Sequence, residues 1–191
     1  SVPQDYVEFP SQLHELWGFH PEVVANYARH HETGDPMPEN EIKDLMAHLN
    51  EVAKAEIFTY LTLSVCDDAL HSKDAYLKDL EQVQMQALDA YNIPSSITGK
   101  ICFISQQKFL FCNQAYSARC YSYLWGRILA VHVFEHMLES GGFCRETGKK
   151  FHDEVLCIGA AKPPKQALED YLDSPISLQT AVKSILNISN L

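Results

Sequence analysis

The stretch ENEIKDLMAHLNEVAKAEIFTYLTLSVCDDALH, residues 39–71, decides the fold class. Its apolar residues recur at intervals of three and four. This spacing places them on one face of an α-helix rather than on alternate sides of a strand. The apolar positions are Ile42, Leu45, Met46, Leu49, Val52, Ile57, Leu61 and Val65. The stretch therefore predicts one long amphipathic helix whose apolar face needs a partner.

The same helical period runs through the rest of the chain. Turn residues gather at 33–38 (TGDPMP) and at 92–100 (NIPSSITGK), where they separate helical segments. KICFIS, residues 100–105, could be extended. Further helices are expected over about 11–17, 21–32, 72–91, 106–139, 145–157, 164–172 and 176–187. The pattern predicts an all-α, multi-helix array in which residues 1–191 form a single helical domain.

Length and charge exclude several classes of function. A chain of 191 residues can build a core of its own. It carries 15 Lys and Arg against 25 Asp and Glu, a net charge of −10. An acidic surface repels both the phosphates of nucleic acids and anionic lipid headgroups. No apolar run reaches the roughly 18 residues of a membrane-spanning helix, so we expect neither direct nucleic-acid binding nor membrane insertion.

The six cysteines form no CxxC or CxxH pair, and most lie in apolar, helix-like stretches. We therefore expect buried, reduced thiols, as in the cytosol, the nucleus or the mitochondrial matrix. The chain begins at Ser1 without Met, which suggests either that a presequence has been removed or that the chain is a piece of something longer.

His132-Val133-Phe134-Glu135-His136 matches the HxxEH pattern of inverted zincins. On a helix both imidazoles share one face and could hold a metal ion, with Glu135 as general base. A catalytic zinc also needs a third protein ligand, which in that class lies far enough downstream to fall beyond Leu191. We interpret the pattern as a helix surface with two histidines and a carboxylate. A self-contained metalloenzyme would require metal at His132 and His136.

Two other clusters have simple structural interpretations. Arg29-His30-His31-Glu32 falls at the C-terminal end of an expected helix, where cations stabilise the helix by interacting favourably with its dipole. Tyr116, Tyr121, Tyr123 and Trp125 could line a binding groove or belong to the core. No glycine-rich phosphate loop and no GxSxG elbow occurs, so nucleotide-binding and serine-hydrolase functions have no support.

Three segments together resemble one family of zinc metallopeptidases. They are DYVEFPSQLHELW at 5–17, ARHHETGDPMPEN at 28–40 and YSARCYSYLWGR at 116–127. The chain resembles the C-terminal part of the thimet oligopeptidase and mitochondrial intermediate peptidase family over essentially all its residues, and the third segment is closest to the mitochondrial intermediate peptidase branch. The resemblance implies part of a nearly all-helical, zincin-like clamshell around a deep channel, which cuts short peptides or trims presequences.

The resemblance also implies a zinc site to which this chain contributes one residue. The family holds zinc by an HExxH helix and by a Glu on the next helix, and Glu8 matches that third ligand. HExxH occurs nowhere in the 191 residues. Because a zinc site needs three or four ligands, we expect no cofactor for this chain alone, and zinc only with an HExxH-bearing partner.

The family's substrate segment is altered here. Where the family has a His that supports the tetrahedral intermediate, this chain has Phe111 or Cys112, depending on the alignment, and Cys120 replaces the first tyrosine of an adjacent pair. Tyr116, Tyr121 and Tyr123 remain. Loss of one oxyanion donor costs about 10²- to 10³-fold in turnover. The glycine-rich segment near the family's C-terminus is reduced to Ile158-Gly159-Ala160-Ala161.

Two functions follow from the resemblance. The first is a non-catalytic remnant that serves as an accessory or structural subunit of a larger mitochondrial complex, with protein partners covering the face of the missing lobe. The second is one chain of a split or processed zinc endopeptidase, in which Glu8 completes in trans a site whose HExxH lies on another polypeptide. Location on the matrix side of mitochondria is expected from the resemblance alone. Peptide binding would follow only if the channel is kept, which the sequence leaves open.

Overall fold

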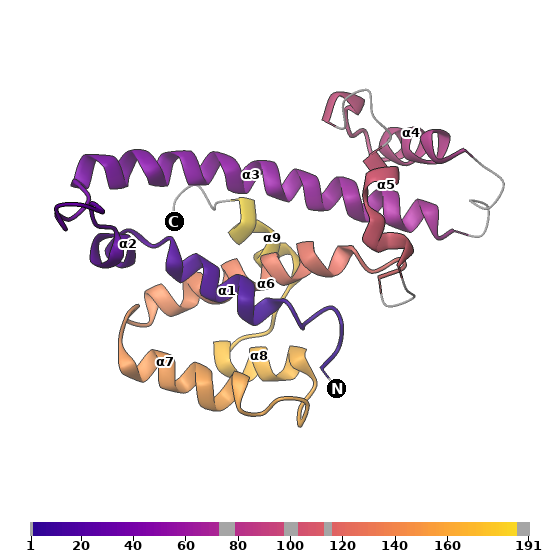
Figure 1. Ribbon diagram of the computed structural model, residues 1–191. Coiled ribbons are helices and arrows are strands. Elements are labelled where there is room, and N and C mark those ends of the chain that lie inside the picture. Colours follow the sequence, from indigo (N-terminus) through magenta and orange to yellow (C-terminus); the bar gives the residue numbers. More distant parts are fainter. Residues whose placement is uncertain (1, 73–78, 98–102, 113–115, 187–191) are drawn as a thin grey trace. The chain divides into compact units, whose positions relative to one another are not determined.

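The computed structural model describes residues 2–72, 79–97, 103–112 and 116–186 (Figure 1). Within these ranges the chain is helical and contains no β-strand, which confirms the all-α prediction. The longest helix, α3 (Glu39–Leu70), matches the stretch whose period indicated it. No helix in the described part is both long and apolar enough to cross a lipid bilayer.

The chain divides into two compact units, which are described separately. Unit 1 contains residues 1–54 and 125–191, and unit 2 contains residues 55–124. Two helices, α3 and α6 (Tyr121–Glu139), each contribute residues to both units.

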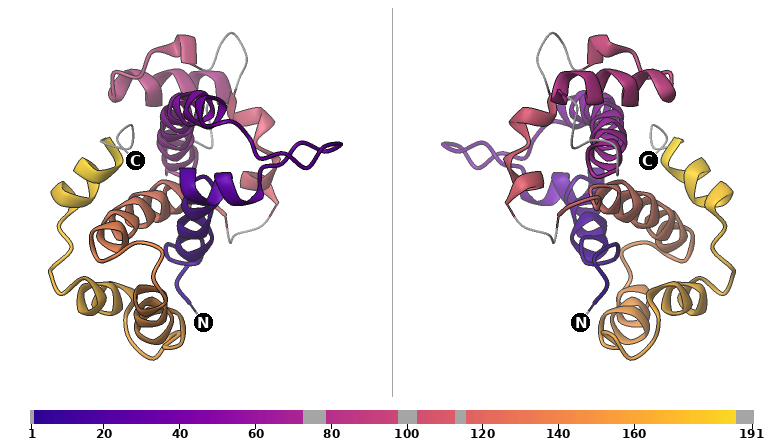
Figure 2. Two further views of the ribbon diagram at one scale, coloured as in Figure 1. Left: turned by 90° about the vertical axis from the view of Figure 1, so that its left-hand side faces the viewer. Right: turned by 90° about the vertical axis from the view of Figure 1, so that its right-hand side faces the viewer.

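Unit 1 combines part of these two helices with five shorter ones and a turn of π-helix. The shorter elements are α1 (Phe9–Gly18), α2 (Pro21–Tyr27), α7 (Arg145–Phe151), the π-helical turn η4 (His152–Leu156), α8 (Pro164–Leu172) and α9 (Leu178–Leu186). The views in Figure 2 show α7 and α8 side by side, and α8 packs against η4. Prolines lie in the first turns of α1, α2 and α8, where the missing N–H has no helical acceptor to lose.

The core of unit 1 is built on aromatic contacts between α1, α6, α7 and α8. Phe9 contacts Phe151 edge-on with ring centroids 6.3 Å apart, and Phe151 contacts Tyr171 at 5.6 Å. A Cβ at Gly126 would lie 2.6 Å from Gln12 Oε1, so the glycine permits the close approach of α6 to α1. The buried members of this core are Tyr6, Phe9, Leu13, Leu129, Ala130, Val133, Phe134, Met137, Phe151, Val155, Leu168, Tyr171 and Leu172.

Unit 2 packs short elements against the C-terminal half of α3. These elements are α4 (Leu80–Ala90), the 3-10 turns η2 (Ser95–Ile97) and η3 (Lys108–Phe111), and α5 (Phe103–Gln106). Asp79 caps α4 by accepting a hydrogen bond from the Glu81 amide at 3.1 Å. The buried Gln84 accepts one from the Ile104 amide at 3.1 Å, which joins α4 to α5. The core residues are Leu63, Cys66, Val83, Leu88, Ile93, Ile104, Leu110 and Cys120.

Three predicted segments differ from the structure. The helix expected over 106–139 begins only at Tyr121, because residues 108–111 form η3 and residues 116–118 form a turn. The stretch considered as extended is helical over 103–106, and its residues 100–102 lie outside the described part. The helix expected from 72 begins at Leu80, and residues 73–78 also lie outside the described part.

The interpretation of Arg29–Glu32 as the end of a helix is wrong. Helix α2 ends at Tyr27, and Ala28 is already extended. Arg29 forms an antiparallel bridge with Pro36, and the amide of Met37 donates to the carbonyl of Ala28 at 3.0 Å. These side chains therefore belong to a turn that folds back on itself. They do not lie at the C-terminus of a helix, where they would interact with its dipole.

Leu13 provides a test of the unit 1 core. The Leu13→Ala substitution empties a fully buried site, so we expect it to lower the free energy of unfolding by about 2–5 kcal/mol. The matched control is Leu178→Ala, because Leu178 is 62% exposed and its truncation should cost less than about 0.5 kcal/mol. Urea unfolding followed by circular dichroism measures both. Equal losses would contradict the assignment of Leu13 to the core.

Candidate functional site

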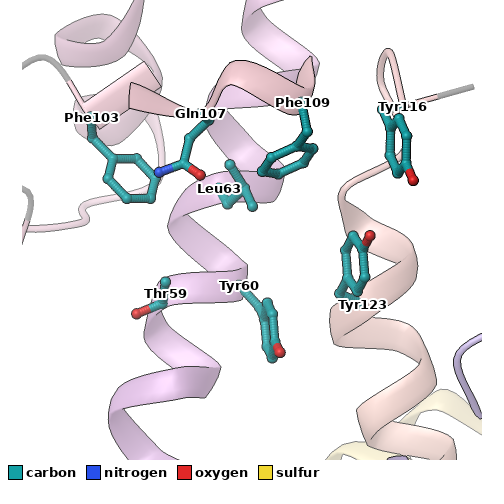
Figure 3. Close-up of a pocket in the computed structure, with 8 residues that line it drawn as sticks. All are labelled: Thr59, Tyr60, Leu63, Phe103, Gln107, Phe109, Tyr116 and Tyr123. Carbon is teal, nitrogen blue, oxygen red and sulfur yellow. The ribbon is translucent and has the colours of Figure 1, made fainter. Parts of the chain in front are cut away.

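An aromatic groove in unit 2 collects two of the tyrosines that the sequence singled out. Its volume is about 380 Å³, within the usual range of ligand pockets. Figure 3 shows side chains from α3, from the segment that contains α5 and η3, and from α6 and the turn before it around one space. The lining residues are Thr59, Tyr60, Leu63, Phe103, Gln107, Phe109, Tyr116 and Tyr123.

Two aromatic pairs shape this groove. Tyr60 on α3 stacks on Tyr123 of α6 with ring centroids 6.0 Å apart and planes inclined by 11°. Phe109 meets Tyr116 edge-on at 5.8 Å (Figure 3). Tyrosine rings present an apolar face with a polar tip, so this lining can bind apolar side chains and also form hydrogen bonds with a peptide backbone.

Tyr121, the third predicted tyrosine, lies outside this groove. It is 50% exposed and does not line the pocket. It precedes Tyr123 by two positions on α6, and such residues lie about 200° apart around a helix axis. The helix therefore separates the two tyrosines that follow Cys120.

A buried carboxylate fixes the loop before α6. Asp67 of α3 is 1% exposed, and its two oxygens accept hydrogen bonds from the amides of Ala118 at 3.1 Å and Cys120 at 2.9 Å. His71 Nδ1 lies 2.8 Å from Asp67 Oδ1. Ala118 has a φ of 55°, the left-handed region that costs a non-glycine residue about 1–2 kcal/mol. This conformation turns the amides of the loop toward one anion.

Cys120 is sealed inside this arrangement. Burial is the main cause that raises the pKa of its thiol, and the neighbouring Asp67 carboxylate raises it further. The thiol therefore stays protonated at neutral pH. A protonated thiol is a weak hydrogen-bond donor, and a side chain that is 1% exposed does not reach a ligand in the groove.

Position 111 or 112 has no strong hydrogen-bond donor either. Phe111 is 55% exposed at the end of η3. Cys112 is exposed as well, and its Sγ lies 3.2 Å from the carbonyl oxygen of Lys108. Neither side chain can stabilise an oxyanion as an imidazole would.

The prediction of buried cysteines is therefore only partly correct. Cys66 and Cys120 are buried and Cys144 is half-buried, but Cys112 and Cys157 are exposed. Both exposed residues directly follow a short turn, η3 or η4, where the apolar face of the preceding helix has ended. Cys102 lies outside the described residues.

Glu8, the predicted metal ligand, lies at the start of α1. It is partly buried, and the Ser11 hydroxyl donates to its carbonyl oxygen at 2.8 Å and lies 3.4 Å from its carboxylate. In the described part of the chain, one group of three possible metal-binding side chains converges, and Glu8 is not in it. The described residues therefore do not form a zinc site around Glu8.

The two histidines of the HxxEH pattern contact different neighbours. His132 Nδ1 lies 3.2 Å from Ser184 Oγ on α9, whereas the ring of His136 packs edge-on against Tyr171 of α8 at 5.4 Å. The converging group contains neither of them nor Glu135. Their contacts lie within the helical packing of unit 1.

Comparison with known proteins decides the family. The sequence matches the profile of peptidase family M3 over residues 1–185. The chain belongs to peptidase family M3. Oligopeptidase A of Escherichia coli strain K12 is 36% identical over 167 residues, which cover 85% of this chain and 24% of that relative. Dipeptidyl carboxypeptidase of the same strain is 32% identical over 83% of this chain and 24% of its own length.

A mitochondrial relative aligns over a similar range. Mitochondrial intermediate peptidase of Candida glabrata is 27% identical over 176 residues, 90% of this chain and 22% of the relative. The chain thus spans about a quarter of the length of the curated relatives that it matches. M3 peptidases are zinc enzymes.

Sequence reasoning missed Tyr60 and Asp67. Tyr60, Leu63 and Asp67 follow at intervals of three and four, which places all three on one face of α3. An acidic residue in an apolar stripe must find a partner when it is buried. That interruption of the stripe was the signal that could have identified the anchor of the loop.

Removing the Asp67 carboxylate should destabilise unit 2. The Asp67→Ala substitution removes the acceptor of the Cys120 amide and leaves the Ala118 amide with only its longer bond, to His71 Nδ1 at 3.3 Å. We therefore expect a loss of about 2–5 kcal/mol in the free energy of unfolding. Asp67→Asn keeps one acceptor and should lose less. The exposed neighbour provides the control Asp68→Asn, which should change stability by less than about 0.5 kcal/mol. Urea unfolding compares them, and equal effects at 67 and 68 would contradict the anchoring role.

His132 should make the stability depend on pH. Burial is the main cause that lowers its pKa, while Glu135 and Glu139 act in the opposite direction. The unfolded chain binds this proton near the ordinary pKa of about 6.5, whereas the folded chain binds it only at lower pH. Stability from this residue is therefore complete above about pH 6.5 and is lost as the pH falls below it.

The measurement compares urea unfolding at about pH 7.5 and about pH 5. The native chain should lose more stability between these values than His132→Gln. His31→Gln is the matched control, because the His31 side chain is 82% exposed and its removal should leave the pH dependence as it is. Identical pH dependence in the native chain and in His132→Gln would refute the prediction.

Proposed function

We propose that this chain is a non-catalytic, peptide-binding part of an M3 peptidase fold, which acts as an accessory subunit of a larger protein assembly. One observation carries the proposal: the aromatic groove keeps Tyr116 and Tyr123, while Cys120 at the neighbouring family position is buried on Asp67. On this proposal, the chain keeps a surface that can bind a peptide but lacks the groups that would cut it.

The composition of the site supports this division. Phe111 or Cys112 stands where the family has a histidine, and neither offers a strong donor to an oxyanion. Hydrolysis by this chain alone would further require zinc, and Glu8 is one of the three protein ligands that a catalytic zinc needs. The groove itself requires no metal to bind a peptide.

A second function rests on Glu8. It is held at the start of α1 by Ser11 and keeps its family position. Another polypeptide that carries HExxH could supply the two remaining protein ligands, so that this chain completes the zinc site of a split endopeptidase in trans. That arrangement would restore the metal but would leave positions 111, 112 and 120 altered.

Exposed apolar side chains support a protein partner. On unit 2, Phe58 of α3 and Met85 of α4 are both 53% exposed, and Tyr91 follows α4 at 64%. Exposed apolar surface of this kind marks protein interfaces when it is contiguous. A partner that covers the face of a missing lobe would bury such residues.

The compartment is proposed from relatives alone. Mitochondrial intermediate peptidases of two fungi match 90% of this chain and support a place on the matrix side of mitochondria. The Arabidopsis thaliana relative named "Probable cytosolic oligopeptidase A" matches over a similar range at 26% identity and supports the cytosol. The proposed peptide-binding role is compatible with both compartments.

Peptide binding and cleavage by the purified chain test the proposal. Short fluorescent peptides should bind without being cut, with or without added zinc. Tyr123→Ala removes one ring of the stacked pair, so we expect peptide binding to weaken about tenfold or more. Tyr121→Ala is the matched control, because this tyrosine lies outside the groove and its loss should leave the affinity unchanged. Fluorescence anisotropy measures affinity, and mass spectrometry detects cleavage.

The other outcomes distinguish the two functions. Cleavage by the chain alone would show that the non-catalytic assignment is wrong. Cleavage that appears only with an HExxH-bearing partner and disappears in Glu8→Gln would favour the split enzyme. Equal weakening by Tyr121→Ala and Tyr123→Ala would remove the groove from the proposal.

A further inference from the structure

The π-helical turn η4 brings together two residues that an α-helix would hold apart. Residues five positions apart lie about 140° apart around an α-helix axis. In η4 the amide of Cys157 donates to the carbonyl of His152 at 2.8 Å, which is the i to i+5 bond of a π-turn. Such turns are rare and often occur at functional sites. Here the turn places the side chain of Cys157 next to that of His152.

Three metal-binding atoms converge at this turn. Cys157 Sγ lies 3.4 Å from both Nδ1 and Nε2 of His152, and Asp153 Oδ1 lies 2.9 Å from Nδ1. The ligand atoms of all three residues lie within 4.8 Å of one another. Tetrahedral zinc with usual bond lengths separates nitrogen from sulfur by about 3.6 Å and nitrogen from oxygen by about 3.3 Å. The two distances from Nδ1 would therefore have to lengthen by only a few tenths of an ångström. The exposed imidazole would also turn about its side-chain bonds, so that Nδ1 rather than the ring face points at the ion.

We propose that His152, Asp153 and Cys157 bind one Zn²⁺ ion, with water as the fourth ligand. Imidazole nitrogen and thiolate sulfur suit zinc, whereas Ca²⁺ and Mg²⁺ take sets of oxygen ligands. One thiolate and one carboxylate balance the two positive charges of the ion. Nothing in this site involves Glu8 or the aromatic groove, so the proposal is independent of the proposed function.

The surroundings orient the ligands and leave them accessible. Lys149 pairs with Asp153 Oδ2, which leaves Oδ1 directed toward the imidazole. The side chains of His152 and Asp153 are 62% and 48% exposed, so an ion can enter from solvent. His152 also lines a mainly apolar groove of about 780 Å³ in unit 1, together with Phe151 and Leu156. An ion here would exchange with solvent rather than hold the fold together.

Titration with Co²⁺, followed by displacement with Zn²⁺, tests the site on the reduced 191-residue chain. We expect one equivalent of Co²⁺ to produce a thiolate charge-transfer absorption that Zn²⁺ abolishes. Cys157→Ser and His152→Gln each remove a direct ligand and should weaken binding about 100-fold or more. The matched control is Cys112→Ser, which removes another exposed thiol and should leave the absorption unchanged.

Alkylation provides a second measurement in the same sample. Zn²⁺ should protect Cys157 from iodoacetamide but leave Cys112 reactive, as mass spectrometry of the digested chain would show. Absence of a thiolate band, equal loss in Cys112→Ser or equal protection of both thiols would overturn the proposal. So would zinc binding that survives Cys157→Ser and His152→Gln but disappears in His136→Gln. Circular dichroism checks that these surface variants remain folded.

Discussion

The buried carboxylate of Asp67 is the interaction on which the tyrosine segment depends. A charge removed from water costs several kcal/mol unless hydrogen bonds replace its hydration. Here the amides of Ala118 and Cys120 supply those bonds, and His71 contacts the same carboxylate. To direct these amides at the carboxylate, the loop places Ala118 in the left-handed conformation. Helix α6 begins after this loop, at Tyr121. The start of α6 in turn decides which tyrosine faces Tyr60.

The same anchor leaves the identity of the side chain at position 120 open. The bonds to Asp67 come from backbone amides, so they do not depend on the side chain at position 120. A tyrosine there could be exchanged for cysteine while the loop kept its path, and the small thiol then joins the core of unit 2. Tyr116 and Tyr123 lie on either side of this point and keep their places in the groove. The lining of the groove by these two tyrosines is therefore independent of the side chain at position 120.

The sequence predicted those parts of the fold in which helical period alone decides the structure. The helix expected over 164–172 has the observed bounds, and α3 differs from its expected range by one residue. The period failed over 107–112, because apolar residues such as Leu110 are buried there by a short turn rather than by one helix. For the site, motif resemblance identified Tyr116 and Tyr123, but their partner Tyr60 is set by tertiary packing, which no local pattern contains.

The cluster at η4 shows why helical period can also conceal a site. A helical wheel places His152 and Cys157 on different faces, so an α-helix over residues 145–157 would give them no reason to meet. A π-turn has one more residue than an α-helical turn, so it brings residues five positions apart to the same side. The hydrogen bond from the Cys157 amide to the His152 carbonyl, from i+5 to i, marks this turn. Because His152 and Asp153 are exposed, the core of unit 1 gains little from their contact with Cys157. The buried Val155 of the same turn belongs to that core, so packing holds the turn, whereas the proposed chelation would use the contact between His152 and Cys157.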